Sequence, residues 1–227
     1  MFMGSIVNAV AVIIGSLIGL FFKKSFPESI KNIIFQGLGL CTLAIGINMV
    51  FKVENILIVI FSILLGAISG EILKIQEFFD GLGDYVKNAL RSRNQDFTEG
   101  FVSAFLIFCV GVMTIMGSFD SGIRNDHTLL YTKSILDGFC SIALASTLGS
   151  GVLFSSIPLF LFQASLTFFA KWIEPFFGNF VISQITATGG ILVLAIGINL
   201  LQIKKIKVSS LLPSLVFVVI LSIIFKK

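Results

Sequence analysis

The chain has 227 residues, of which 56% are hydrophobic and only 12% are charged, with 16 Lys and Arg against 12 Asp and Glu. An ordinary globular domain is about one quarter charged, so too few polar side chains are present to cover a water-exposed surface. This composition excludes intrinsic disorder, collagen and a disulfide-stapled secreted module, and it argues against a soluble enzyme or a nucleic-acid-binding protein. We expect the lipid bilayer to surround most of the chain.

Stretches without charged residues predict the membrane spans. A spanning helix needs about 20 apolar residues to cross a hydrocarbon core of about 30 Å, and most of these stretches have that length. No alternating pattern of a membrane barrel is present, so backbone hydrogen bonding in lipid requires helices. The predicted fold class is an all-α polytopic membrane protein. The stretches are 1–22, 32–51, 55–70, 100–119, 138–170, 175–203 and 208–225.

The stretch 138–170 is too long for one span and contains Gly149-Ser150-Gly151, which predicts a turn between two segments. The first segment has only a dozen apolar residues after Asp137. It either extends back through Lys133 to cross the bilayer or forms a re-entrant half-helix. The total is therefore seven or eight spans. Residues 1–22 lack the features of a signal peptide and are interpreted as a permanent first span.

The long polar segment between Glu71 and Glu99 has apolar residues at every third or fourth position. This spacing predicts an amphipathic helix over 72–93 that lies in the membrane interface. Lys and Arg collect in cytoplasmic loops, and their distribution favours an N-terminus outside the cell. The count is ten cytoplasmic against six outside for seven or eight spans alike, so it does not decide the number.

An internal repeat is the most informative feature of the chain. Leu43–Asn48 recurs unchanged as Leu194–Asn199, 151 residues later. We call this separation the repeat offset. Asn8 corresponds to Gln163 when an insertion of four residues is allowed. We therefore divide the single membrane domain into a first repeat, an interfacial helix and loop, a central helix pair and a second repeat. The repeats are inverted if five spans precede the second copy and parallel if four do. The divisions are 1–73, 74–99, 100–151 and 152–227.

Inverted repeats in a membrane indicate a protein that exposes one central site to either side, which favours a secondary transporter. Glycine-containing breaks in corresponding spans are where such proteins offer backbone groups to a solute, here Gly46–Asn48 and Gly197–Asn199. The alternative is that each Gly-x-Asn ends a helix near the interface, because Lys52 and Lys204 follow closely.

Ionisable side chains within spans are costly and indicate function. Asp137 follows Lys133 by four residues, so the two can pair along one helix face, and Asp120 lies at the end of the fourth span. We expect neutral amides to bind a small polar solute, with Asp120 or Asp137 binding a coupling cation or proton. The alternative role of each amide is a hydrogen bond between helices. The candidate binding residues are Asn8, Asn48, Asp120, Asp137, Gln163 and Asn199.

Catalytic constellations are not expected. His127 is the single histidine, and neither metal-ligand spacing nor a phosphate-binding loop is present, so we predict no catalytic residue, metal site or cofactor. Small residues at every fourth position, such as Ala11, Gly15 and Gly19, indicate close helix packing within the bundle or in a homodimer. The alternative to a transporter is a membrane scaffold or regulatory subunit that is recognised through the helix at 72–93.

The segments 111–118, 133–138 and 144–152, together with Gly4–Ala9 and Leu194–Asn199, resemble the YqgA-like prokaryotic integral membrane proteins, a domain of unknown function (554). The resemblance runs nearly end to end and implies a single domain in a bacterial inner membrane. That family commonly has a proline at the position of Val112, so a proline kink is not expected here. The resemblance implies no activity and no site residues.

Overall fold

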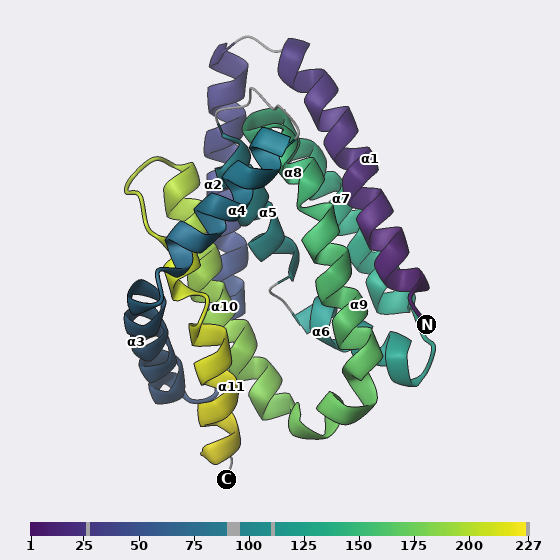
Figure 1. Ribbon diagram of the computed structural model, residues 1–227, viewed down its shortest axis with the longest axis vertical. Helices are drawn as coiled ribbons and strands as arrows, with labels where there is room; N and C mark the ends of the chain where they lie inside the picture. Colours follow the sequence, from purple (N-terminus) through teal and green to yellow (C-terminus); the bar gives the residue numbers. More distant parts are fainter. Residues whose placement is uncertain (26–27, 90–95, 110–111, 226–227) are drawn as a thin grey trace. The chain divides into compact units, whose positions relative to one another are not determined.

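The computed structural model describes residues 1–25, 28–89, 96–109 and 112–225. Every regular element among these residues is a helix (Figure 1), which confirms the predicted all-α class. In chain order the elements are α1 (Met3–Ser25), α2 (Glu28–Val50), α3 (Ile56–Ile72), α4 (Ile75–Ala89), α5 (Phe97–Cys109), α6 (Val112–Ile123), α7 (Thr128–Leu148), α8 (Ser150–Phe154), α9 (Ser156–Ile173), η1 (Glu174–Phe176), α10 (Asn179–Leu200), η2 (Val208–Leu211) and α11 (Ser214–Ile224).

Three helical segments among the described residues are long and apolar enough to cross a membrane, namely Met3–Phe22, Ser150–Trp172 and Asn179–Leu200. A fourth is added if α5 and α6 form one bent span. Shorter apolar helices cover Gly39–Val50, Ile56–Ile72 and Val208–Ile224. The described helices thus supply several apolar spans, while the number of seven or eight stays a prediction.

The chain forms two compact units. The first contains Met1–Phe35 and Leu82–Glu174, and the second contains Gln36–Gly81 and Pro175–Lys227. The chain passes from one unit to the other within α2, within α4 and again within η1. The first unit holds α1 and α5–α9, and the second holds most of α2 with α3, α10 and α11.

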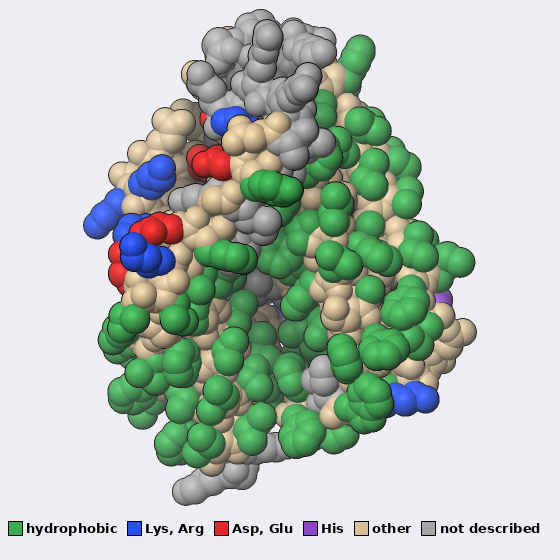
Figure 2. All heavy atoms as spheres, viewed as in Figure 1, with side chains coloured by type: hydrophobic (Ala, Val, Ile, Leu, Met, Phe, Trp, Pro, Cys, Tyr) green, Lys and Arg blue, Asp and Glu red, His purple; other side chains and the backbone are tan. Residues whose placement is uncertain are grey.

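In the first unit α1 packs in parallel along α7 through small residues. A Cβ atom on Gly15 would collide with the carbonyl oxygen of Gly138, and one on Gly19 would collide with that of Ile142. Large apolar side chains point the other way, and Figure 2 shows that hydrophobic side chains cover most of the visible face. Small residues facing protein and large ones facing outward is the arrangement expected of helices packed in lipid. Exposed large residues of α1 include Ile6, Val10, Ile14, Leu17 and Phe21.

The fourth predicted span is broken. Helices α5 and α6 are bent by 60° relative to each other. The bend forms without a proline, because Val112 stands at the position where the family that the sequence resembles commonly has proline. The Thr114 hydroxyl donates a hydrogen bond of 2.9 Å to the carbonyl oxygen of Phe108. It thereby satisfies one of the carbonyls left without a partner where α5 ends. A threonine one turn into the second helix can therefore stabilise the break without proline.

The predicted turn after the central pair is confirmed. Helix α7 runs without interruption through Lys133, so it extends back as a full-length helix and ends at Leu148. Gly149 has φ 83°, which a residue with a side chain rarely adopts. The chain then continues through α8 into α9. The predicted amphipathic helix at 72–93 corresponds to α4, while Leu90, Arg91 and Arg93 lie outside the described residues.

In the second unit α2 and α10 cross in antiparallel through four glycines. A Cβ atom on Gly46 would lie 2.8 Å from Cγ of Leu194, and one on Gly197 would lie 2.8 Å from Cδ2 of Leu43. These two contacts are reciprocal, because the repeat offset carries Gly46 onto Gly197 and Leu43 onto Leu194.

The outer contacts of the same crossing are reciprocal as well. A Cβ atom on Gly39 would lie 2.6 Å from Cγ of Leu201, and one on Gly190 would lie 2.8 Å from the backbone nitrogen of Val50. The repeat offset carries Gly39 onto Gly190 and Val50 onto Leu201. Helix α3 packs on the η2–α11 segment, where Gly70 lies against the carbonyl of Ser210.

Replacing Gly15 with Ala should destabilise the protein by about 1–3 kcal/mol, because the added methyl group collides with the α7 backbone. Gly37 also lies in a helix, but a Cβ atom there meets nothing within 4 Å, so Gly37→Ala should be neutral or stabilising by up to ~1 kcal/mol. Thermal unfolding in detergent compares the two variants. Equal melting temperatures would contradict the close α1–α7 contact.

Candidate functional site

A buried polar cluster joins α7 to α1 in the first unit. Lys133 and Asp137 are one helical turn apart and form an ion pair, as their spacing predicts. The Asn8 Nδ2 atom donates a hydrogen bond of 3.0 Å to Oδ2 of the same carboxylate. The exposed fractions are 6% for Lys133, 7% for Asp137 and 0% for Asn8. Two of the six predicted binding residues are therefore in direct contact.

Helix packing places these side chains together. The close α1–α7 contact sets Asn8 beside Asp137, and the Lys133 ammonium lies 5.9 Å from the centre of the Phe108 ring of α5. Burying two charges costs several kcal/mol each, which their attraction offsets only when good hydrogen bonds accompany it. Hydrophobic residues in their place would satisfy packing at lower cost, so a buried pair in an apolar helix indicates a role beyond stability.

Two buried amides have atoms without a hydrogen-bond partner among the described residues. The Asn8 Oδ1 atom accepts no hydrogen bond, and both amide atoms of Gln163 on α9 are unpaired. Gln163 is fully buried, but no hydrogen bond within the described part of the chain joins it to the cluster. An unpaired buried polar group costs about 1–3 kcal/mol, so these amides are candidates for contact with a solute or water.

The other predicted acid, Asp120, is located near the end of α6. Its carboxylate pairs with Arg124 one turn later, and the exposed fractions of these side chains are 16% and 61%. A partly exposed pair at a helix end is what we expect of charges near a membrane interface. Asp120 and Asp137 have different partners, and the deeper burial of Asp137 favours it for a role inside the helix packing.

Asn48 and Asn199 both belong to the second unit, but they lie at different heights along the crossing helices α2 and α10. The reciprocal crossing places Asn199 beside position 41 of α2, which is about 10 Å along the helix from Asn48 at about 1.5 Å per residue. Asn199 binds the backbone of Ile206, donating to its carbonyl at 2.9 Å and accepting from its N–H at 2.7 Å. Asn48 is exposed.

We call such a pair of hydrogen bonds, from one side-chain amide to the backbone of one residue, a clasp; a second clasp joins Gln184 to Asn55. The repeat offset relates Ile206 to Asn55. In the amide orientation that satisfies both partners, the Gln184 oxygen accepts from the Asn55 N–H at 2.6 Å and its nitrogen donates to the Asn55 carbonyl at 3.3 Å. The repeat in the sequence did not point to Gln184 for this contact. The repeat offset relates it to position 33, which is Ile and has no polar side chain.

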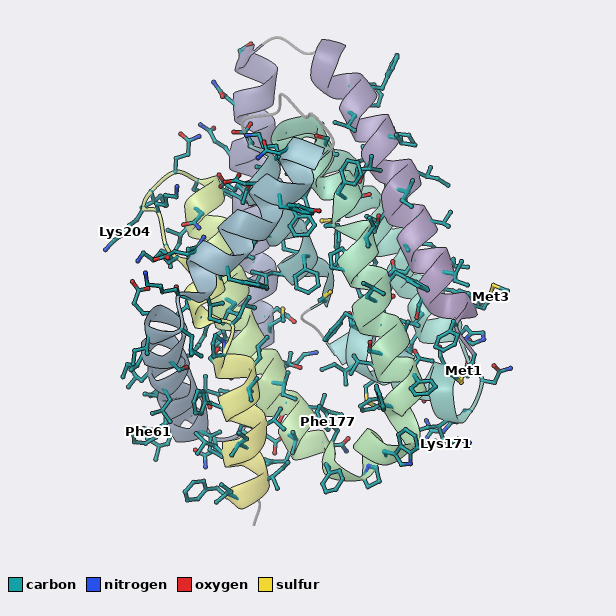
Figure 3. All side chains as sticks on the ribbon, viewed as in Figure 1. Met1, Met3, Phe61, Lys171, Phe177 and Lys204 are labelled. Carbon is teal, nitrogen blue, oxygen red and sulfur yellow. The ribbon has the colours of Figure 1, made fainter. Side chains whose placement is uncertain are left out.

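A surface hollow of the first unit lies apart from these residues. Met1 and Lys171, both labelled in Figure 3, line it together with Gly122, Phe168 and Trp172. None of the predicted binding residues contributes to it.

Comparisons with known proteins give a family without an activity. Residues 3–223 match the family described as "Protein of unknown function (DUF554)". The chain is 35% identical over 216 residues, 93% of this chain and 92% of the relative, to "Uncharacterized membrane protein YdfK" of Bacillus subtilis (strain 168). It is 32% identical over 227 residues, 98% of this chain and 97% of the relative, to "Uncharacterized protein YqgA" of Escherichia coli (strain K12). No solved structure matches.

Lys133→Met alone should destabilise the protein by about 3–5 kcal/mol, because it leaves the Asp137 carboxylate buried without a counter-charge. The double variant Lys133→Met, Asp137→Leu removes both charges and should recover most of that loss. A double-mutant cycle on melting temperature measures the coupling between the two sites. Additive effects of the two single substitutions would show that no buried pair is present.

Proposed function

We propose that this chain, which belongs to the DUF554 family of proteins of unknown function, is a secondary transporter or permease for a small polar or charged solute. The name of the Bacillus relative and the apolar helices support a membrane protein. The observation that carries the transport proposal is the reciprocal crossing of α2 and α10.

The crossing supports an inverted repeat. Its contacts pair Gly46 with Leu194 and Gly197 with Leu43 in antiparallel helices, as expected if a two-fold axis perpendicular to the helices relates the copies. For helices that span a bilayer, such an axis lies in the membrane plane, which is the relation between the halves of many transporters. The helix boundaries agree with such a repeat. Adding the repeat offset to α2 gives 179–201, and α10 covers 179–200. Adding it to α3 gives 207–223, and η2 with α11 covers 208–224.

The two clasps support two conformational states. Ile206 is held by Asn199 of its own repeat, whereas Asn55 is held by Gln184 and the corresponding Asn48 is exposed. When inverted repeats adopt different local conformations, exchanging those conformations opens the site to the opposite side. In the opposite state we expect Asn48 to hold the Asn55 backbone.

This proposal includes eight membrane crossings in a bacterial inner membrane, with the N-terminus outside. The crossings are α1, α2, α3, α5 with α6, α7, α8 with α9, α10, and η2 with α11. The loop at 51–55 would then lie outside and that at 202–207 in the cytoplasm.

The solute or its coupling ion would bind at the cluster of Asn8, Lys133 and Asp137. It combines a donor ammonium, an acceptor carboxylate and an amide in a dry helix interface, which suits a small polar or charged molecule. Gln163, the counterpart of Asn8 in the second repeat, offers an unpaired amide on α9.

A transporter should be stabilised by its solute, because binding to the folded state raises the melting temperature by mass action. The purified protein would be screened against amino acids, organic acids, amines and inorganic ions. We expect a hit whose stabilisation is lost in Asp137→Asn and kept in Asp126→Asn, a matched change of an exposed loop carboxylate. Insensitivity to every solute, together with stoichiometric co-purification of another protein, would instead favour the membrane scaffold.

A further inference from the structure

Several neutral polar atoms in the first unit are buried without partners. In the described part of the chain, neither amide atom of Gln163 nor Oδ1 of Asn8 has a hydrogen-bond partner, and both side chains are fully buried. The hydroxyls of Ser5, Ser118 and Thr167 are also unpaired, and at most 1% of each residue is exposed. Nearly all buried polar groups in proteins are hydrogen-bonded, so these atoms need an explanation. We call the five residues the unpaired set.

Helices α1 and α9 pack against each other and run in opposite directions (Figure 1). The surface hollow gives their relative height, because Met1, just before α1, lines it together with Phe168, Lys171 and Trp172 of α9. Met1 and Lys171 are labelled in Figure 3 at that end of the two helices. The start of α1 is therefore level with residues 168–172.

Counting along the two helices then matches members of the unpaired set. In antiparallel helices with the same rise per residue, the residue numbers at one height have a constant sum, here about 169–173. Asn8 is thus level with residues 161–165, which include Gln163. Ser5 is level with residues 164–168, which include Thr167. The two unpaired amides share one layer of this helix pair, and two unpaired hydroxyls share the next.

Ser118 belongs to the same junction through α6. A Cβ atom on Gly4 of α1 would lie 2.8 Å from Cβ of Leu130, and one on Gly117 of α6 would lie 2.9 Å from Cδ2 of the same leucine. The next residues in the chain, Ser5 and Ser118, are therefore level with that leucine. Helix α6 also packs directly on α9. The unpaired set thus lies where α1, α6 and α9 meet.

The unpaired set contains both donors and acceptors of hydrogen bonds. The Gln163 nitrogen donates, the amide oxygens of Gln163 and Asn8 accept, and each hydroxyl does both. A cation would satisfy the oxygens and leave the Gln163 nitrogen without an acceptor. An anion would leave the two amide oxygens without a donor. A molecule that carries both donors and acceptors satisfies every member of the set.

The charged pair that touches the unpaired set is already balanced. Asn8 contacts Asp137, whose negative charge is opposed by the Lys133 ammonium. An ion that enters a dry helix interface loses its hydration, and neutral amides and hydroxyls return only part of that cost. Residues 3–22 of α1 supply no charged side chain to compensate it. The surroundings therefore favour a molecule without net charge.

We propose that the unpaired set binds a small uncharged solute that both donates and accepts hydrogen bonds, such as an amide or a polyol. This inference rests on the proposed transport function and narrows its class of solute. The polar groups that cost stability in the empty protein are the groups that gain partners when the solute binds. Water is the alternative occupant of the junction, and the experiments below distinguish the two.

Gln163 and Gln184 provide a matched comparison, because both are fully buried glutamines and Gln184 clasps the Asn55 backbone. Gln163→Leu should raise the melting temperature of the solute-free protein in detergent by about 2–5 °C, since it removes unpaired buried atoms. Gln184→Leu should lower it, since the Asn55 backbone loses its partner. A lower melting temperature for Gln163→Leu would show that its amide is paired in the folded protein and would overturn the proposal.

The class of solute is tested by melting temperatures in acetamide, lactamide, glycerol and erythritol, with sodium acetate and ammonium chloride as charged counterparts. At least one uncharged probe should stabilise the wild type more than it stabilises Gln163→Leu, because binding to the folded state raises the melting temperature. The comparison removes the general effect of polyols on protein stability. Thr167→Val should weaken the stabilisation, and Thr132→Val, a matched change of an exposed threonine on α7, should keep it.

The outcomes separate this inference from the transport proposal. Equal effects of every uncharged probe on the wild type and Gln163→Leu would mean that water fills the junction, and the uncharged-solute site would be overturned. If acetate, ammonium or a compound of the screen described above still stabilised the wild type, the transport proposal would stand without it. If no compound did, both would fail.

Discussion

Helix backbones in this protein approach one another through glycine and other small residues, and the rest of the structure depends on that approach. Lipid chains are as apolar as leucine, so burial of apolar area does not drive helices together in a membrane, and close packing has to do so. Gly15 and Gly19 bring α1 onto α7, and Gly46 with Gly197 brings α2 onto α10. Larger side chains at these positions would separate the helices by the width of a methyl group or more.

The same approach creates the polar site. Asn8 reaches Asp137 because glycines on α1 allow that helix to lie directly on α7. In a looser interface, water or lipid would separate the amide from the carboxylate. Close packing and the buried charge therefore depend on each other, since hydrogen bonds inside a dry interface make an ion pair tolerable.

Local patterns in the sequence predicted those parts of the molecule that local physics determines. Charge-free stretches indicated the all-α class, Gly149-Ser150-Gly151 indicated the turn after α7, and the spacing of Lys133 and Asp137 indicated the ion pair. The bend between α5 and α6 was missed, because Val112 replaces the proline common in the family and the Thr114 hydroxyl instead satisfies the Phe108 carbonyl. Asn8 and Asp137 were both selected as binding residues, but their direct hydrogen bond was not predicted, and neither was the contact of Gln184 with Asn55, since no local spacing encodes them.

The central claim is that two copies of one helical unit face opposite sides of the membrane. The most direct measurement labels single cysteines with a membrane-impermeant maleimide in intact cells. Lys52→Cys and Lys205→Cys would each be placed in a chain whose Cys41, Cys109 and Cys140 are replaced by Ala. We predict that position 52 is labelled from outside and position 205 only after the cells are opened. Labelling of both from the same side would make the repeats parallel and contradict the account.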